Sequence, residues 1–523
     1  MKRGILDGAS VGALLTAPLV AVSYLAWKLA GLPFAPFDLF DWIAQALPGS
    51  VVTFGINSLV SVSRLLQAGS TGVAAKTAEQ TMAIAMMFVA GSVAGAVLFG
   101  VLRMSGEPAL LFGVILGAVM GGAALIIEQE MNRIPGGSFV EGSWVVATFL
   151  AWGLVFGWVH DRLREAGEHA TNGRPAAEGA VEGVDRRRFL IRFGGTTAAT
   201  TFAGALLGVV AGHRRGVGAG ERWSANHALP NGGALIAAAP GTRPELTPLE
   251  RHYRIDTDTR APVVDERRWR LKIGGMVESS LELTLDELRR YEPVHQFVTL
   301  ECISNPVGGD LIGTTRWTGV SLQRLLPRFA VKPGATHLKI MSTDGFHEVI
   351  ALDIIEKDRR VMLTHAWDGV PLPAEHGFPL RVYIPNVYGM KQPKWIQAID
   401  AIDRWEPGFW VARGWDQEGQ MNATSVVDTI AVRAKITDAN GGALVPLGGI
   451  AHAGARGISR VEVRVDDGEW SEAQLRDPLS ETTWVVWRSD CPVQQGEHTF
   501  SVRCYDGNGA PQVAPFHSKR ARV

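Results

Sequence analysis

The first 165 residues contain uncharged apolar runs that are long enough to cross a membrane. No charged residue lies between Asp7 and Lys28, and further uncharged runs cover residues 82–102, 108–127 and 142–159. A helix needs about 20 apolar residues to cross the hydrocarbon core of a bilayer. The sequence therefore predicts an all-α transmembrane region at residues 1–165, with its first span near residues 8–30.

A fifth uncharged run, at residues 42–63, is interrupted by polar residues, proline and glycine. We interpret it as an interfacial or re-entrant segment. With four crossings, Lys2, Arg103 and Arg162 all fall on the cytoplasmic side, as the positive-inside rule requires. A fifth crossing would leave Arg162 outside. Four spans are therefore predicted.

The composition narrows the classes of partner and cofactor. The first 159 residues contain no histidine, and haem ligation within a membrane commonly needs histidines on facing helices, so no haem is predicted. Lys plus Arg number 51 against 52 Asp plus Glu, and no basic stripe carries aromatic residues, which argues against nucleic-acid binding. Acidic residues near the helix ends are expected to be interfacial charges, with a proton site for a quinone as the alternative. They are Asp38, Asp41, Glu128 and Glu130.

An arginine cluster precedes another apolar run in the middle of the chain. Asp185-Arg-Arg-Arg-Phe-Leu is followed by residues 193–212 without a charge, which resembles a twin-arginine export signal that stays as an anchor. The alternative is the positive flank of an ordinary helix. We expect a cytoplasmic linker at residues 166–185, the signal-anchor at 186–212 and a tether at 213–245. The remaining chain would lie on the periplasmic, extracytoplasmic side of the cytoplasmic (inner) membrane.

A single cysteine stands at the end of an apolar, β-branched stretch in the soluble part. Residues 298–301 indicate a buried strand, and Asn-Pro and Gly-Gly turn signals follow Cys302. The other two cysteines, Cys491 and Cys504, lie near the C-terminus. A lone thiolate cannot supply the four ligands of a structural zinc or iron–sulfur site. Cys302 is therefore a nucleophile, a single soft ligand to a metal that brings other ligands, or an inert buried thiol.

The motifs around Cys302 resemble a known enzyme family. Cys302-Ile-Ser-Asn305, followed by Arg316-Trp-Thr-Gly-Val, is similar to the cysteine motif of the sulfite oxidase family of molybdopterin enzymes. Similarity continues in order through residues 342–346, 367–381 and 388–395 and spans roughly residues 246–523. It implies an α+β molybdopterin-binding domain at residues 246–423 and an immunoglobulin-like β-sandwich at residues 424–523, often used for dimerisation.

The resemblance also implies a set of site residues. Cys302 would ligate molybdenum as the soft donor beside the pterin sulfurs. Positively charged side chains would hold the phosphate of the molybdenum–molybdopterin cofactor. The expected cofactor-binding residues are Arg254, Asn305, Asp344, His376, Arg381 and Lys394.

The substrate side departs from the family pattern. The family's arginine five residues after the cysteine is Val307 here, and its tyrosine near the metal is Trp415. Sulfite is therefore a poor match for this pocket, because a charged contact to an oxyanion contributes a few kcal/mol. Arg316, Arg404 and Arg413 are candidate replacements. The expected catalytic residues are Cys302, Arg316, Arg413 and Trp415.

The sequence therefore predicts a membrane-anchored molybdenum oxidoreductase that transfers an oxo group to or from a small, sulfur-containing substrate. The chain has no haem-attachment or ferredoxin-like cysteine motif, which implies a separate electron carrier such as cytochrome c or a quinol-linked membrane protein. The alternatives are a sulfoxide reductase of the same fold and a non-catalytic anchored cofactor-binding or interaction module. We also expect a homodimer through the C-terminal domain, where Cys491 and Cys504 would flank a hairpin and could form a disulfide.

Overall fold

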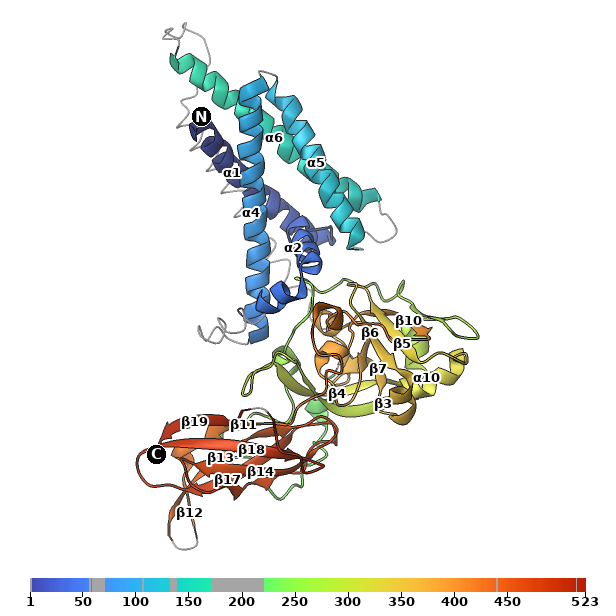
Figure 1. Ribbon diagram of the computed structural model, residues 1–523, viewed down its shortest axis with the longest axis vertical. Coiled ribbons are helices and arrows are strands. Elements are labelled where there is room, and N and C mark those ends of the chain that lie inside the picture. The colour runs from blue at the N-terminus through green and yellow to red at the C-terminus, as the bar shows by residue number, and fades with distance from the viewer. Residues whose placement is uncertain are drawn as a thin grey trace. The chain divides into compact units, whose positions relative to one another are not determined.

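The computed structural model describes residues 2–55, 58, 71–105, 108–131, 139–171, 221–438, 441–513 and 515–523. The chain divides into two compact units, one mostly helical and one rich in sheet (Figure 1). The twin-arginine-like segment at residues 186–212, most of the predicted linker and the start of the tether lie outside the described residues. Those predictions therefore stay untested, as do the predicted domain boundaries.

The helical unit contains the predicted spans. Over the described residues, four helices are long and apolar enough to cross a membrane. The described part of the run at residues 42–63 contributes no such helix, and the interfacial interpretation of this run stays a prediction. The helices of this region are α1 (Lys2–Ala30), α2 (Ala35–Ala46), α4 (Thr71–Ser105), α5 (Ala109–Glu130) and α6 (Phe139–Thr171).

Pairs of glycines let these helices pack with their backbones in contact. A Cβ atom on Gly12 of α1 would lie 2.1 Å from the carbonyl oxygen of Gly91 in α4. One on Gly113 of α5 would lie 2.3 Å from the carbonyl oxygen of Gly153 in α6, and Figure 1 shows α5 and α6 side by side. Each of these four glycines has a second glycine four residues away in its helix. This small-residue spacing is typical of closely packed membrane helices.

Three of the four acidic residues that were expected at an interface are buried, whereas the fourth, Glu130, is exposed. Asp38, Asp41 and Glu128 are buried within the protein and do not extend toward an interface. Arg260 donates a hydrogen bond of 2.7 Å to Asp38, and the backbone N–H of Thr259 donates one of 2.9 Å to Asp41. Residues 257–260 belong to the same compact unit as these helices. Partners from a distant part of the sequence therefore hold carboxylates that hydropathy alone places at the surface.

Residues 261–423 form two sheets, one mixed and one antiparallel, with short helices. One sheet has the order β2-β1-β10-β5-β6, in which only β1 and β10 run parallel. The other has the order β3-β4-β7-β8, with β9 beside β7. The strands are β1 (Leu271–Gly275), β2 (Leu281–Leu283), β3 (Val294–Glu301), β4 (Ile312–Ser321), β5 (His337–Ser342), β6 (His347–Ala351), β7 (Met362–Trp367), β8 (Val370–Pro371), β9 (Arg381–Tyr383) and β10 (Ile396–Ile402).

Short helices and 3-10 turns precede, connect and follow these strands. They are α8 (Trp223–Asn226), α9 (Leu285–Arg289), α10 (Leu322–Phe329) and α11 (Leu352–Lys357), with 3-10 turns η2 (Leu249–Arg251), η3 (Ala374–His376), η4 (Gly389–Lys391), η5 (Val411–Arg413) and η6 (Val432–Ala434). The sequence pattern Thr284-x-x-Glu287 predicts the start of α9. The structure confirms the capping box, since the Thr284 hydroxyl accepts from the Glu287 N–H and the Glu287 carboxylate accepts from the Thr284 N–H.

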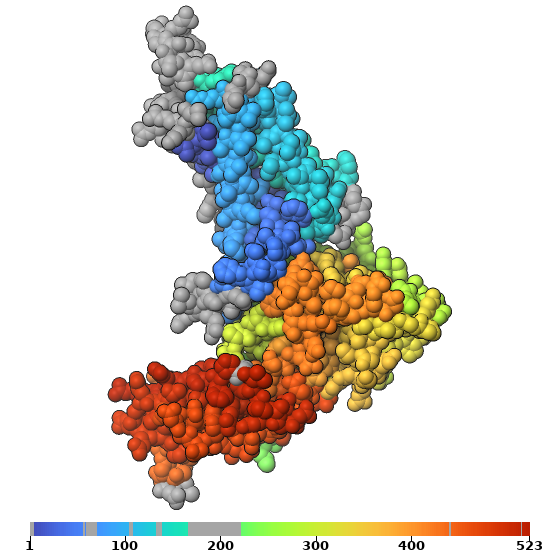
Figure 2. Space-filling model, viewed as in Figure 1, coloured from blue at the N-terminus to red at the C-terminus, as the bar shows by residue number. Residues whose placement is uncertain are grey.

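The C-terminal domain consists of two antiparallel sheets with a shared core. Trp487 from one sheet and Phe500 from the other are fully buried in that core. Figure 2 shows one face of this domain, in red and orange-red. The immunoglobulin-like topology stays a prediction. One sheet contains β11 (Thr424–Ile430), β12 (Ile436–Thr437), β13 (Ala443–His452), β16 (Gln474–Leu475) and β17 (Val485–Pro492), and the other contains β14 (Ile458–Val465), β15 (Ser471–Glu472), β18 (Glu497–Asp506) and β19 (His517–Arg522).

The expected hairpin between the two C-terminal cysteines is wrong. Cys491 lies at the end of β17 and Cys504 lies in β18, and these consecutive strands belong to different sheets. Both cysteines are free thiols in the structure. The chain crosses from one sheet to the other between them, as sandwich folds require, whereas a hairpin would have kept both strands in one sheet.

Candidate active site

Cys302 occupies the first position after strand β3, as the sequence predicts. Its backbone N–H donates a hydrogen bond of 3.0 Å to the carbonyl of Leu311, and its carbonyl accepts one of 2.9 Å from the N–H of Asn305. The residue is only 7% exposed. Burial raises the pKa of the Cys302 thiol to about 11. A soft metal cation is the partner that would hold such a buried group as a thiolate.

Asn305 holds the loop that carries Cys302. Its amide nitrogen donates to the Glu301 carboxylate at 3.0 Å, and its amide oxygen accepts from the Leu311 N–H at 3.0 Å. These bonds tie the end of β3 to the residue before β4. Asn305 thus holds this loop through its side-chain amide, and its predicted contact with the cofactor stays a prediction.

Arg381 lies between two fully buried indole rings. The centre of its guanidinium is 4.7 Å from the ring centroid of Trp317 in β4 and 5.1 Å from that of Trp367 in β7. One terminal nitrogen donates to the His376 carbonyl at 3.1 Å, and Nε has no hydrogen-bond partner among the described residues. Burial lowers the pKa of Arg381 to about 10. A buried cation that lacks a carboxylate partner is costly, so the site is suited to an anion.

A second cation lies beside Arg381. The Lys394 ammonium donates to the carbonyl of Ile255 at 3.1 Å and contacts the Asp256 carboxylate at 3.3 Å. Burial lowers the pKa of Lys394 to about 8. Gly377, at φ +114°, separates the two side chains, and a Cβ there would lie 3.1 Å from the Cβ of Arg381 and 3.2 Å from that of Lys394. Only glycine adopts this backbone readily. Because residue 377 has no side chain, Arg381 and Lys394 lie close together, and we call this pair of cations the cradle.

The remaining predicted cofactor residues surround this cradle. Arg254 donates to Asp256 at 2.7 Å, and this carboxylate is shared with Lys394. Asp344 is buried in the turn between β5 and β6, where it accepts from the Phe346 N–H at 3.2 Å. His376 is buried, and burial keeps its pKa well below the ordinary value, so its ring is neutral.

The donor set fits a molybdenum–molybdopterin cofactor. Three cations, Arg254, Arg381 and Lys394, face two carboxylates, Asp256 and Asp344, which leaves positive charge for a phosphate. The partnerless Nε of Arg381 supplies an unused donor within the described structure. Cys302 would supply one soft protein ligand to the metal of such a cofactor.

The sequence analysis assigns no role to two further side chains at this site, those of His252 and Tyr253. The His252 ring is buried against the indole of Trp367, with centroids 4.6 Å apart, and burial lowers its pKa to about 3. Burial and the neighbouring Cys302 raise the pKa of Tyr253 well above its ordinary value, so its phenol stays protonated. Tyr253 opens the segment at residues 253–257 and His252 directly precedes it, and this segment matches the family pattern too loosely to assign either residue.

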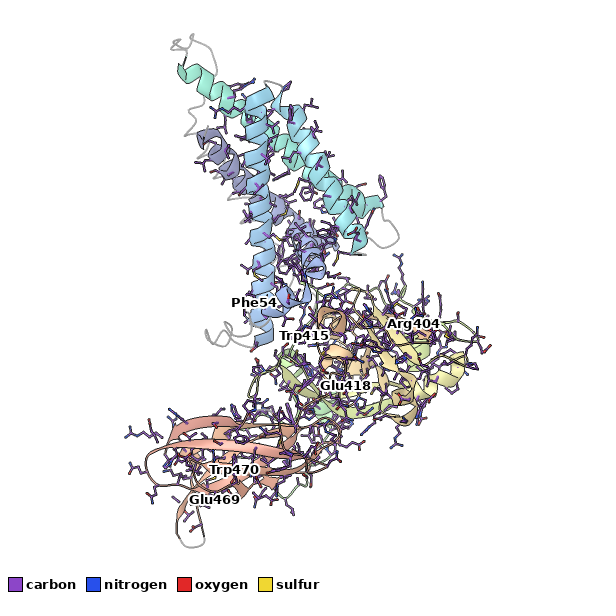
Figure 3. The ribbon with its side chains drawn as sticks, in the orientation of Figure 1. Phe54, Arg404, Trp415, Glu418, Glu469 and Trp470 are labelled. Carbon is purple, nitrogen blue, oxygen red and sulfur yellow. The ribbon has the colours of Figure 1, made fainter. Side chains whose placement is uncertain are left out.

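The predicted substrate-side residue Trp415 belongs to an apolar cluster. Its ring packs on Trp410 with centroids 5.3 Å apart, and the same cluster includes Ile303, the residue after Cys302. The Trp415 Nε1–H is buried without a hydrogen-bond partner among the described residues. Trp415 is labelled in Figure 3. The cluster contains Ile303, Tyr388, Met390, Trp410, Val411, Trp415 and Met421.

The structure separates the three candidate arginines. The Arg316 guanidinium lies 4.9 Å from the ring centroid of Trp223, on the opposite face of β4 from Trp317. Arg404, labelled in Figure 3, is exposed and contacts Asp403 at 3.7 Å. Arg413 lies on the same loop as Trp415, where its guanidinium stacks on Phe409 at 3.7 Å and donates to the Phe409 carbonyl at 2.9 Å. Only Arg413 therefore accompanies Trp415.

Comparison with known proteins agrees with this geometry. Residues 258–410 match the oxidoreductase molybdopterin-binding domain. This part of the chain is therefore similar to the molybdopterin-binding domain of oxidoreductases such as the sulfite oxidases. The domain thus contains Cys302, Asp344, His376, Arg381 and Lys394 within its matched length.

Individual relatives cover only part of the chain. Mitochondrial sulfite oxidase of Macaca fascicularis is 27% identical over 49% of this chain and 54% of its own length. A protein of Azospira oryzae named for a protein-methionine-sulfoxide reductase subunit is 29% identical over 34% of this chain and 64% of its own length. The sulfane dehydrogenase SoxCD of Paracoccus pantotrophus is 21% identical, covers 53% of this chain and 79% of its own, and has a TM-score of 0.45. The chain spans about half the length of the sulfite oxidases it matches.

Proposed function

We propose that this protein is a membrane-anchored molybdenum–molybdopterin oxidoreductase that interconverts a small neutral sulfoxide and its thioether. The observation that carries the substrate class is the apolar cluster of Trp415, Trp410, Ile303 and Met421 beside Cys302. An anion such as sulfite requires charged donors, whereas a thioether is bound well by aromatic and methionine side chains.

The cofactor would be held by residues of two kinds. Cys302 would ligate the metal, and Arg381 and Lys394 would bind the phosphate, with Arg254, Asp344, His376 and Asn305 positioning the pterin and the loop. When bound, this group supplies two-electron oxo-transfer chemistry. The chain itself contributes orientation and exclusion of water.

Trp415 is the residue of this chain suited to orient the substrate. Its buried Nε1–H would donate a hydrogen bond to the sulfoxide oxygen, and Trp410 and Met421 would contact the alkyl groups. Reduction consumes one sulfoxide, two electrons and two protons, and yields one thioether and one water. The electrons come from a separate carrier, a cytochrome c or a quinol-linked membrane protein.

The four apolar helices support anchoring in a membrane. The proposed arrangement is a multi-pass protein of the cytoplasmic membrane with the molybdopterin domain on the periplasmic side. The C-terminal sheets support the proposed immunoglobulin-like domain and its use in a homodimer. None of these proposals affects the choice of substrate.

Substrate competition tests the proposed function. The holoenzyme is assayed with dimethyl sulfoxide and methionine sulfoxide against reduced viologen, and with sulfite against ferricyanide. We expect kcat/KM for a sulfoxide to exceed that for sulfite by at least about 10-fold, because Val307 stands where the family has an arginine, and such a charged contact contributes about 1.5–3 kcal/mol. A higher kcat/KM for sulfite would overturn the proposal and favour the activity named for the mammalian relatives.

The position of Arg316 gives a separate prediction. Because its side chain stacks on Trp223 away from Trp317, Arg316→Met should change KM by no more than about twofold, as for positions outside a site. Trp415→Phe, which removes the Nε1–H donor, should raise KM about fivefold, the effect of one lost hydrogen bond. Steady-state kinetics on both variants decide the assignment. If Arg316→Met raises KM more than Trp415→Phe does, Arg316 contacts the substrate as the sequence predicted.

A further inference from the structure

A second cavity lies in the molybdopterin domain away from the residues assigned to the cofactor. Its volume is about 320 Å³, within the lower part of the range for small-molecule sites. Three isoleucines, Ile350 on β6, Ile354 on α11 and Ile384 after β9, line its apolar side. Its polar side contains Glu348 and Lys391. None of these five residues has a part in the proposed reaction.

Glu348 and Lys391, which are both among the residues that line this cavity, form a buried ion pair. Glu348 Oε1 and Lys391 Nζ are 2.7 Å apart, and the two side chains are 1% and 9% exposed. Glu348 Oε2 is buried and has no hydrogen-bond partner among the described residues. Burial raises the pKa of Glu348, and the neighbouring Lys391 counteracts this. An unsatisfied carboxylate oxygen in the interior is costly, so its retention indicates a donor that is supplied from outside the chain.

Lys391 also retains a donor. An ammonium group has three N–H bonds. One is directed to Glu348, and a second goes to the Gln417 carbonyl at 3.1 Å. The third has no acceptor among the described residues. Two residues that line the cavity therefore retain one unused acceptor and one unused donor, and three isoleucines line the same cavity.

We propose that this cavity binds a free α-amino acid with an apolar side chain. The ligand's ammonium would donate to Glu348 Oε2, its carboxylate would accept from Lys391 Nζ, and its side chain would contact Ile350, Ile354 and Ile384. A simple amine would leave the Lys391 donor unused, and a simple carboxylate would leave the Glu348 acceptor unused. Only a zwitterion satisfies both groups without changing the net charge of the cavity.

The cavity shares a loop with the substrate side. Gln417, Glu418 and Gln420 line it, and Trp415 lies on the same loop; Trp415 and Glu418 are both labelled in Figure 3. Gly419 in this loop, at φ +60°, packs so closely on Lys391 that a Cβ would lie 2.7 Å from its Cγ. A ligand on Lys391 would therefore bias the position of this loop. That effect on KM rests on the proposed function, whereas binding itself does not.

Isothermal titration calorimetry on the full-length holoenzyme tests the binding. The probes are L-leucine, L-methionine and L-phenylalanine, with 3-methylbutan-1-amine and 4-methylpentanoate as analogues of leucine that lack one charge. We expect at least one amino acid to bind, and each analogue to bind at least about 10-fold more weakly, since a contact to a charged group contributes about 1.5–3 kcal/mol. No binding of any amino acid at 10 mM, or equal binding of an analogue, would overturn the site.

Variants separate a specific site from general effects on folding. Ile354→Trp should fill the cavity and abolish binding, and Ile354 is exposed enough (43%) that the fold should tolerate the larger ring. Glu348→Gln should weaken binding at least 10-fold for the reason given above. The matched control is Glu406→Gln, whose carboxylate pairs with Lys339 at 2.9 Å outside the cavity and should leave binding unchanged. Unaltered binding in Ile354→Trp would place the ligand elsewhere.

Discussion

Replacing Cys302 with serine is expected to remove the metal–thiolate absorption and to lower turnover more than about 100-fold, beyond the range seen when outer partners of metal ligands are changed. The pterin should remain bound at near wild-type content. Its phosphate and ring contacts come from Arg381, Lys394 and their neighbours, which do not depend on the thiol. Molybdenum and pterin content, absorption spectra and sulfoxide turnover are measured on the same preparations.

The other two cysteines provide the control for this experiment. Cys491 and Cys504 are buried free thiols in the C-terminal domain. Cys491→Ser and Cys504→Ser should leave the absorption spectrum and the molybdenum content unchanged. If Cys302→Ser keeps the wild-type spectrum, Cys302 is the inert buried thiol that the sequence alone left open. Absence of molybdenum in the wild type, expressed in a host that makes the cofactor, would instead leave an anchored binding module.

The parts of the fold that depend on local periodicity were predictable from the sequence. Four uncharged runs correspond to the four candidate spans, and the β-branched stretch before Cys302 is strand β3. The Thr284–Glu287 capping box starts α9. In each case the signal lies within a few residues of the structure it specifies, so no tertiary information is needed.

The parts that depend on packing between distant segments were not predictable. Alternation in β4 puts Arg316 and Trp317 on opposite faces, but the sequence does not say which face meets Arg381. Hydropathy placed Asp38 at an interface, because its partner Arg260 comes more than 200 residues later. The glycine pairs of the helical unit were readable as small-residue spacing, although only the structure shows which helices they join.

The site residues illustrate the same division. The family resemblance identifies directly the motifs that contain Cys302, His376, Arg381 and Lys394. The structure places Arg381 and Lys394 together in the cradle, with His376 beside it. The family resemblance assigns no site role to Glu348 or Lys391. Its two members are 43 residues apart in sequence, and each is unremarkable until the fold buries them together.

The burial of Arg381 yields the second large prediction, in which affinity and stability change in opposite directions. Arg381→Met keeps an unbranched side chain between Trp317 and Trp367 but shortens it and removes the charge. Loss of charge-assisted contacts to the cofactor phosphate should weaken pterin retention about 10- to 100-fold. The apo protein should be at least as stable as wild type, because a buried cation without a carboxylate partner is replaced by an apolar side chain. Pterin fluorescence after denaturation reports the first effect.

Thermal unfolding of protein from a host that cannot make the cofactor reports the second effect of Arg381→Met. Arg324→Met is the matched control, since Arg324 forms a surface pair with Glu292 at 2.6 Å and is half exposed. That variant should change neither pterin content nor Tm appreciably, as isolated surface pairs contribute little. A purely structural Arg381 would give the reverse of the predicted pattern, a lower apo Tm with pterin content that falls only as the folded fraction falls. Lower pterin content together with an unchanged or higher apo Tm would assign the guanidinium to the bound anion. A purely structural role would instead make both quantities fall.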